Sequence, residues 1–172
     1  ELHADQKQLL ARYAASLVGP HDCVYVDSGS TTKVLVDCLM EKGALYVTNS
    51  AVHGLTLAQR GFTVVLLGGE LKGSTSAMVG PEALDVLERY NFTLGFWGAN
   101  GIDLQAGCTS PEREESQVKR ASLARSARRL VLADTSKFGR VAPVSFASLD
   151  QVEVLTTSVP EGYEDVPSVR CV

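Results

Sequence analysis

Short apolar runs that end in polar, glycine-containing turns recur along this chain, and this recurrence constrains the fold more than any other feature. Helical patterns separate the runs, so strands and helices are expected to alternate. The expected strands are Cys23–Val26, 44–47, 63–67, Phe92–Trp97, 130–133 and 152–156. Nearly continuous apolar strands joined by helices are typical of a parallel sheet that is covered on both faces. The sequence therefore predicts an α/β fold with a mainly parallel sheet.

Apolar spacing and stop signals predict the helices between these strands. In the first helix, Leu9, Leu10 and Tyr13 recur at helical spacing, and Gly19 and Pro20 end it. The expected helices are 5–18, a segment through 34–39, Ala51–Gln59, 81–90 and 112–128. The tail after Ser158 is expected to hold a short edge strand. Because no long linker or repeat interrupts the alternation, residues 1–172 are predicted to form a single domain.

Charge and cysteine content argue against several classes of protein. The formal net charge is −4 and the pI is about 5.4, whereas a domain that binds DNA by itself usually has a basic face. The four cysteines and three histidines lack metal-ligand spacing, so no metal site, cofactor or disulfide framework is predicted. Because the sequence has neither a signal peptide nor an apolar run of transmembrane length, we expect a cytoplasmic protein without membrane contact.

The polar turns follow the expected strands at their carboxyl ends. These turns are 27–32, 48–50, 68–70, 98–103 and 134–137. In open parallel sheets, ligands bind outside this edge of the sheet. Together the five turns predict one ligand site there.

The turn at residues 28–32 is the sharpest single signal. Gly29 permits a tight turn, and the hydroxyls that follow it lie at the start of an expected helix. Free N–H groups and the helix dipole favour an anion at such a position. The candidate phosphate-binding residues are Ser28, Gly29, Ser30, Thr31, Thr32 and Lys137. The alternative interpretation is that Ser30 or Thr31 caps the helix and that Lys137 is an ordinary surface lysine.

Other charged and aromatic residues also have two interpretations. Carboxylates near the strand ends are candidates to accept hydrogen bonds from ligand hydroxyls, although Glu112 and Glu115 also suit the first turn of a helix. The cations of the long helix are expected on a solvated face rather than on a DNA-binding surface. They are Lys119, Arg120, Arg125, Arg128 and Arg129. Trp97 and its strand neighbours are expected in the core.

In order and spacing, these motifs resemble the sensor domain of DeoR/GlpR-type transcriptional repressors. The matching runs are 27–32, 47–50, 67–70, 98–103 with Gly107 and Thr109, Glu115 with Lys119, and 133–139. The resemblance spans about residues 11–157 and departs at Thr157, where many members have aspartate. It implies a Rossmann-like domain with flanking helices, related to ribose-5-phosphate isomerase and CoA transferases.

The resemblance also implies a function and a set of ligand contacts. Members sense a phosphorylated sugar or sugar alcohol, form homo-oligomers (dimers or tetramers), and bind operator DNA through an N-terminal winged helix-turn-helix that this sequence lacks. The sugar-hydroxyl contacts would be Asp27, Thr48, Asn49, Gly68, Gly69, Glu70, Asn100, Asp103 and Glu115.

The alternative function is a sugar-phosphate isomerase of the related fold. Such an enzyme needs a base beside the carbon that loses its proton. In the isomerases that this chain resembles, acids flank a Gly-Ala pair, whereas Trp97 and Asn100 occupy those positions here. Asp103 and Glu115 remain as possible bases, so the sensor is the preferred interpretation.

Overall fold

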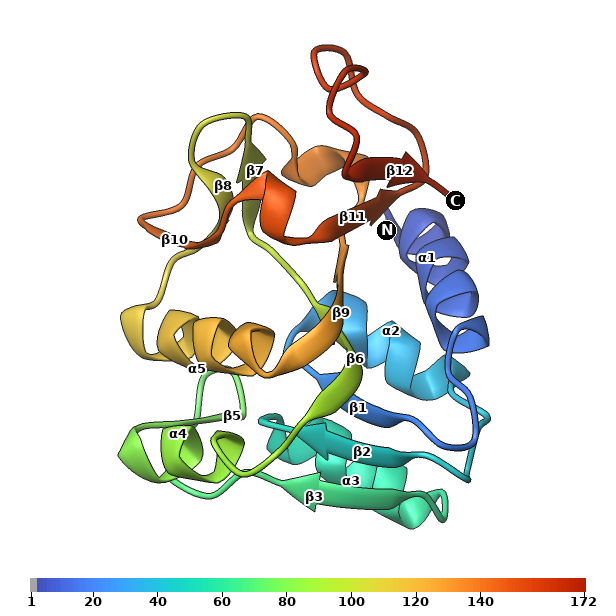
Figure 1. The fold of residues 1–172 in the computed structure, drawn as a ribbon, viewed down its shortest axis with the longest axis vertical. Coiled ribbons are helices and arrows are strands. Elements are labelled where there is room, and N and C mark those ends of the chain that lie inside the picture. The colour runs from blue at the N-terminus through green and yellow to red at the C-terminus, as the bar shows by residue number, and fades with distance from the viewer. Residues whose placement is uncertain (1–2) are drawn as a thin grey trace.

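Seven parallel strands form one sheet in the computed structural model, which describes residues 3–172 (Figure 1). The strand order is β12-β11-β9-β6-β1-β2-β3, with β6 in the centre of the sheet. The bounds are β1 Cys23–Val26, β2 Leu45–Thr48, β3 Thr63–Leu66, β6 Phe92–Trp97, β9 Ser126–Leu132, β11 Glu153–Thr156 and β12 Val169–Cys171. Every pairing within this sheet is parallel, so the predicted α/β fold is confirmed.

Helices cover both faces of the sheet and define two cores. The helices are α1 Ala4–Ser16, α2 Ser30–Cys38, α3 Ala51–Gln59, α4 Pro81–Leu87 and α5 Arg113–Ala124, with short 3-10 helices η1 Thr135–Lys137 and η2 Leu149–Gln151. Leu10 of α1, Leu35 of α2 and Leu57 of α3 are buried in one core. Leu87 of α4 and Val118 of α5 are buried in the other. Because side chains of the sheet point to alternate faces, neighbouring apolar residues of one strand supply both cores.

Two antiparallel additions to the sheet were not predicted from the sequence. One is the hairpin of β4 Glu70–Lys72 and β5 Ala77–Val79, and the other contains β7 Gly101–Asp103, β8 Gly107–Ser110 and β10 Val144–Ala147. The β4–β5 hairpin lies between β3 and α4, and the β7–β8 hairpin lies between β6 and α5, whereas β10 follows β9 in the chain. These strands are only three or four residues long, so the sequence pattern does not reveal them.

The long polar helix is shorter than predicted. It ends at Ala124, and β9 begins at Ser126, which pairs with Phe92 of β6. Arg128 therefore lies on a strand, where its guanidinium donates to the Glu153 carboxylate of β11 at 3.0 and 3.2 Å. Cross-strand pairing thus prevails over the good helix propensity of arginine. In the tail, the expected edge strand is β12.

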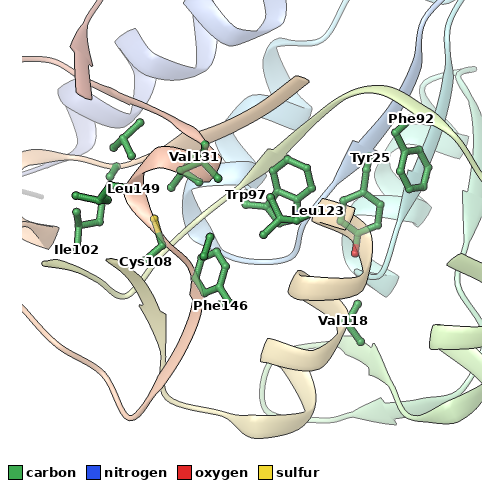
Figure 2. Packing of buried hydrophobic residues seen from close by; sticks show 14 of the residues in the cluster. Tyr25, Phe92, Trp97, Ile102, Cys108, Val118, Leu123, Val131, Phe146 and Leu149 are labelled. Atoms are coloured by element: carbon green, nitrogen blue, oxygen red, sulfur yellow. The ribbon is translucent and has the colours of Figure 1, made fainter. Parts of the chain in front are cut away.

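The single tryptophan anchors the core between β6 and α5. Trp97 is fully buried and stacks on Tyr25 with ring centroids 5.8 Å apart (Figure 2). Its Nε1 donates to Ser122 Oγ at 3.0 Å. The prediction that Trp97 belongs to the core is confirmed. Gly95 makes room for the indole, because a Cβ at that position would lie 2.4 Å from Cη2 of Trp97.

Within residues 3–172, none of the helices has both the length and the apolar composition needed to span a membrane. The same residues contain no cluster of three or more histidine, cysteine, aspartate or glutamate side chains arranged to hold a metal ion. All four cysteines are free thiols.

Candidate functional site

A cavity of about 550 Å³ lies at the carboxyl-end edge of the large sheet, where the polar turns predict a ligand site. Its walls come from the β1–α2 turn, the start of α3, the tip of the β4–β5 hairpin, residues 98–100 after β6, the start of α5 and Lys137 of η1. Its polar lining includes Ser28, Ser30, Thr31, Lys33, Ser50, His53, Ser74, Thr75, Asn100, Ser110, Glu112, Glu115, Lys119 and Lys137. The cavity thus combines hydroxyls, cations and carboxylates in one place.

The β1–α2 turn presents backbone N–H groups to this cavity. The N-cap of α2 is Gly29, whose φ of 124° suits glycine, and no side chain makes a capping hydrogen bond there. Ser30 and Thr31 are the first residues of the helix, so their N–H groups have no intrahelical acceptor. Capping by Ser30 or Thr31 is therefore not what the structure shows. Both residues line the cavity instead.

Buried polar residues at the end of β2 and directly after it hold the turn in place. Asn49 Oδ1 accepts from the Ser28 N–H at 3.1 Å, and Thr48 Oγ1 donates to the Val26 carbonyl at 2.6 Å. Thr48 and Asn49 were predicted as ligand contacts, but they lie behind the cavity wall rather than on it. They shape the turn because β1 and β2 are paired in register up to Val26 and Thr48.

A buried ion pair supports the floor of the cavity. The Lys119 ammonium of α5 donates to Asp27 Oδ2 and to the Gly98 carbonyl, the latter at 3.0 Å. The Lys119 and Asp27 side chains are 7% and 1% exposed, so Lys119 is not on the solvated helix face that was expected. Burial raises the pKa of the Asp27 carboxyl, and the Lys119 ammonium opposes this shift. Asp27 therefore holds Lys119 in place and does not line the cavity.

His53 of α3 is a cavity residue that the sequence analysis missed. Its Nε2 lies 3.1 Å from Thr32 Oγ1, which also donates to the Gly29 carbonyl at 3.2 Å. Burial lowers the pKa of His53 to about 4, so the imidazole is neutral at pH 7. Thr32 is accordingly directed towards His53 and away from the cavity. A lone histidine on a helix gives no sequence signal for such a role.

The tip of the β4–β5 hairpin closes one side of the cavity. Thr75 Oγ1 donates to Glu115 Oε2 at 3.3 Å, and Lys72 Nζ contacts Glu112 at 2.6 Å and Glu114 at 3.1 Å. Burial raises the pKa of the Glu115 carboxyl. Thr75 could not be found from the sequence because the hairpin itself was not predicted.

Several predicted contacts lie outside the cavity because the hairpins carry them away. Glu70 begins β4 and is exposed, and Gly68 and Gly69 precede it. Gly69 has a structural reason to be glycine: its φ is 115°, and a Cβ there would lie 2.4 Å from the Val79 carbonyl oxygen. The prediction that these three residues contact the ligand is therefore not supported by their positions.

Asp103 is the second displaced prediction. It ends β7, and its Oδ2 accepts from the N–H groups of Gln105 at 3.0 Å and Ala106 at 2.9 Å. These bonds lower the pKa of Asp103 and make it a turn former. Of the two possible isomerase bases, Asp103 is thus outside the cavity and Glu115 is inside it.

Comparison with known proteins shows the family to which this sequence is similar. The family model described as the DeoR C-terminal sensor domain matches residues 2–159. The chain is 35% identical over 171 residues to the uncharacterized HTH-type transcriptional regulator FruR of Bacillus subtilis, covering 96% of this chain and 68% of that protein. It is 28% identical over 158 residues to the glycerol-3-phosphate regulon repressor of Escherichia coli, covering 91% of this chain and 63% of that protein.

Solved structures share the fold at low sequence identity. Ribose 5-phosphate isomerase A of Neisseria gonorrhoeae has a TM-score of 0.57 and 18% identity, covering 80% of this chain and 54% of that chain. The eIF2B delta subunit of Chaetomium thermophilum has a TM-score of 0.62 and 15% identity, covering 87% of this chain and 54% of that chain. The predicted relation to the ribose-5-phosphate isomerase fold is confirmed, and this likeness concerns the fold alone.

Proposed function

This chain belongs to the DeoR C-terminal sensor-domain family, and we propose that its cavity binds the phosphorylated sugar or sugar alcohol that controls a transcriptional repressor. The names of its relatives support a role in sugar metabolism: they include a glycerol-3-phosphate regulon repressor and a lactose phosphotransferase system repressor of Staphylococcus aureus. The chain spans 63% and 66% of those two proteins, so the activity of a whole repressor is part of the proposal.

One observation carries the proposal: the uncapped first residues of α2 and Lys137 line the same cavity. The free N–H groups and the dipole of α2 favour an anion, and the ammonium adds a positive charge. Ser30 and Thr31 add two hydroxyls, which can donate to phosphate oxygens. A phosphate group satisfies all of these donors together.

The opposite wall of the cavity is suited to sugar hydroxyls. Asn100 and Glu115 offer a carboxamide and a carboxylate, and Thr75 adds a hydroxyl from the hairpin tip. These groups can accept hydrogen bonds from, or donate them to, a polyol. The ligand would therefore lie with its phosphate at α2 and its hydroxyls towards α5.

In the whole protein, we propose that DNA contacts lie outside this chain. A net charge of −4 does not favour operator binding by the sensor domain itself. An N-terminal winged helix-turn-helix would supply these contacts, as the family resemblance implies. Homo-oligomers, acting in the cytoplasm, would place two DNA-binding domains on the two half-sites of a pseudo-palindromic operator.

The proposal is tested by thermal unfolding in the presence of glycerol 3-phosphate, pentose phosphates and hexose phosphates, each beside its unphosphorylated counterpart. At a hundred times its dissociation constant, a true ligand adds about 2.7 kcal/mol of stability. We expect stabilisation by one or more phosphates and little by the free polyols.

Two variants and one control connect this result to the α2 site. Lys137→Ala and Thr31→Val should weaken binding of the stabilising phosphate, whereas Lys42→Ala should not. Lys42 is exposed and lies just before the amino end of β2, away from the cavity. Equal stabilisation by free sugars and by their phosphates would refute phosphate as the anchor.

A further inference from the structure

Three side chains at the start of α1, those of the N-cap residue His3 and of Gln6 and Lys7, contact both loops that flank the α2 end of the cavity. His3, Gln6 and Lys7 have the i, i+3, i+4 spacing that places residues on the same side of a helix. None of the three lines the cavity. They lie one layer behind it, because α1 packs beside α2 (Figure 1).

Lys7 contacts the turn that we assign to phosphate. Its Nζ donates to Ser30 Oγ at 3.2 Å, and Ser30 lines the cavity. A phosphate oxygen that accepts from Ser30 Oγ would then lie within two hydrogen-bond lengths of Nζ, roughly 6 Å at most. The flexible four-carbon stem of lysine can close this gap.

Gln6 and His3 contact the loop that carries Lys137. Gln6 Oε1 accepts from the Thr135 N–H at 3.0 Å, from Thr135 Oγ1 at 3.2 Å and from Thr157 Oγ1 at 3.0 Å. His3 Nδ1 lies 3.8 Å from Asp134 Oδ1. Thr135 belongs to η1, which also contains Lys137. One turn of α1 therefore touches both elements that would hold a phosphate.

The charges around the cavity leave a dianion incompletely balanced. Lys119 is paired with Asp27, and Lys33 Nζ lies 3.7 Å from the Asp37 carboxylate. Lys137 is the remaining lysine of the lining, and no ion pair is observed for it within residues 3–172. Lys137 alone would balance only part of the charge of a phosphate dianion, so a further cation that moved to Ser30 on binding would be favoured.

We propose that Lys7 of α1 binds the phosphate of the ligand alongside Ser30, so that an occupied cavity fastens the first turns of α1 to the sensor domain. This inference rests on the proposed function and adds to it the element that responds to binding. Ligand binding and the order of α1 would then be linked, and by reciprocity a change that fixes α1 would raise affinity for the ligand. The N-terminal half of α1 is thereby the part of the fold that reports occupancy.

The first test measures inorganic phosphate binding by calorimetry at slightly alkaline pH, with chloride at equal ionic strength as the reference. Lys7→Gln should weaken phosphate binding about tenfold, the effect expected for loss of one charge-assisted hydrogen bond at a partly exposed site. Lys7→Arg should recover most of the affinity. Arg12→Gln is the matched control, because it removes the same charge from an exposed position of the same helix.

The second test follows amide hydrogen exchange. Saturating phosphate should slow exchange over residues 7–11 in the natural chain and in Arg12→Gln, but not in Lys7→Gln. This readout separates ligand coupling from a merely structural role of Lys7, which would change exchange equally with and without phosphate.

The outcomes distinguish the two proposals. If Lys7→Gln binds phosphate as tightly as the natural chain, or if Arg12→Gln loses as much affinity, the role of Lys7 is refuted and the phosphate cavity stands. If the natural chain binds neither inorganic phosphate nor any phosphorylated compound, the cavity assignment fails and the role of Lys7 fails with it.

Discussion

Two kinds of strand-to-helix connection meet at this cavity, and they place polar residues differently relative to it. After β1 and β2, the chain enters α2 and α3 within three residues or fewer. After β3 and β6, a hairpin intervenes before α4 and α5. In the first kind, the residues after the strand form or brace the cavity wall. In the second, only some residues of the connection reach the cavity: Asn100 lines it, whereas Glu70 and Asp103 do not.

A hairpin also places residues of its tip on the cavity wall. The tip of the β4–β5 hairpin places Ser74 and Thr75 on the cavity wall, although Glu70 at its base points elsewhere. The direct β1–α2 connection contains Asp27, whose ion pair with Lys119 is buried. The ion pairs that Lys72 of the hairpin makes with Glu112 and Glu114 of the α5 region are more exposed. Substitutions should therefore affect stability most at the direct connections and least along the hairpins.

The largest expected effect concerns Lys119, which forms an ion pair with Asp27 of the direct β1–α2 connection. Lys119→Met leaves the buried Asp27 carboxylate without its partner, so we expect a loss of about 3–5 kcal/mol in the free energy of unfolding. Urea denaturation measures this loss. The double variant Asp27→Asn with Lys119→Met should recover part of it, because no uncompensated charge remains.

Lys72→Met is the matched comparison from a hairpin. Lys72 also contacts carboxylates, but it bridges the partly exposed Glu112 and Glu114. Its removal should cost far less stability than removal of Lys119, because exposed ion pairs contribute little. Equal losses for the two lysines would contradict the difference between the two kinds of connection.

The next effect concerns His53, which braces the start of α2 through Thr32. Its pKa is lowered by burial from 6.5 to about 4, so between these pH values the unfolded state binds more protons. Stability from the neutral imidazole is therefore complete above about pH 6.5 and is lost as the pH falls towards 4. The full shift corresponds to about 3 kcal/mol.

The contribution of His53 is isolated by comparison with His53→Gln. Free energies of unfolding are measured for both chains between neutral and acidic pH. The carboxylates titrate in both, so the difference between the two curves belongs to the imidazole. If the difference does not change with pH, the buried neutral state of His53 is wrong.

The smallest effect is expected within the β6–α5 connection. Asp103→Asn should leave phosphate-ligand affinity unchanged, because the carboxylate accepts from backbone N–H groups of its own turn. Asn100→Ala, three residues earlier, should weaken binding because Asn100 lines the cavity. Calorimetry on the two variants sharpens the comparison. Loss of affinity in Asp103→Asn alone would reverse it.

The sequence predicts the large sheet because buried parallel strands have a clear local sequence pattern. Runs such as Cys23–Val26 and Phe92–Trp97 are apolar on both faces and end in polar turns, so their type and order could be predicted. The same logic located the edge of the sheet at which the cavity lies. The predicted turns contain Ser28, Gly29, Ser30, Thr31, Asn100 and Lys137, which all line the cavity. Glu115, a candidate at the start of the long helix and by the family resemblance, lines it as well.

What the sequence could not provide depends on contacts between distant segments. Lys119 is buried because Asp27, 92 residues away, neutralises it, and no local pattern records that pairing. Thr75 reaches Glu115 through a hairpin whose strands are too short to show an alternating pattern. A polar residue after a strand was assigned to the site by its position in the sequence. Its place in the structure depends on whether a helix follows directly.

Trp97 provides this protein with an intrinsic fluorescence probe. The chain has one indole, fully buried between β6 and α5, and its Nε1 donates to Ser122, three residues beyond Lys119 of the cavity floor. Emission from an indole shielded in this way shifts when water reaches it, so intrinsic fluorescence follows unfolding of the central sheet without any label. A ligand that displaces α5 changes the polarity around the same ring, and titrations can therefore be read on the unmodified chain.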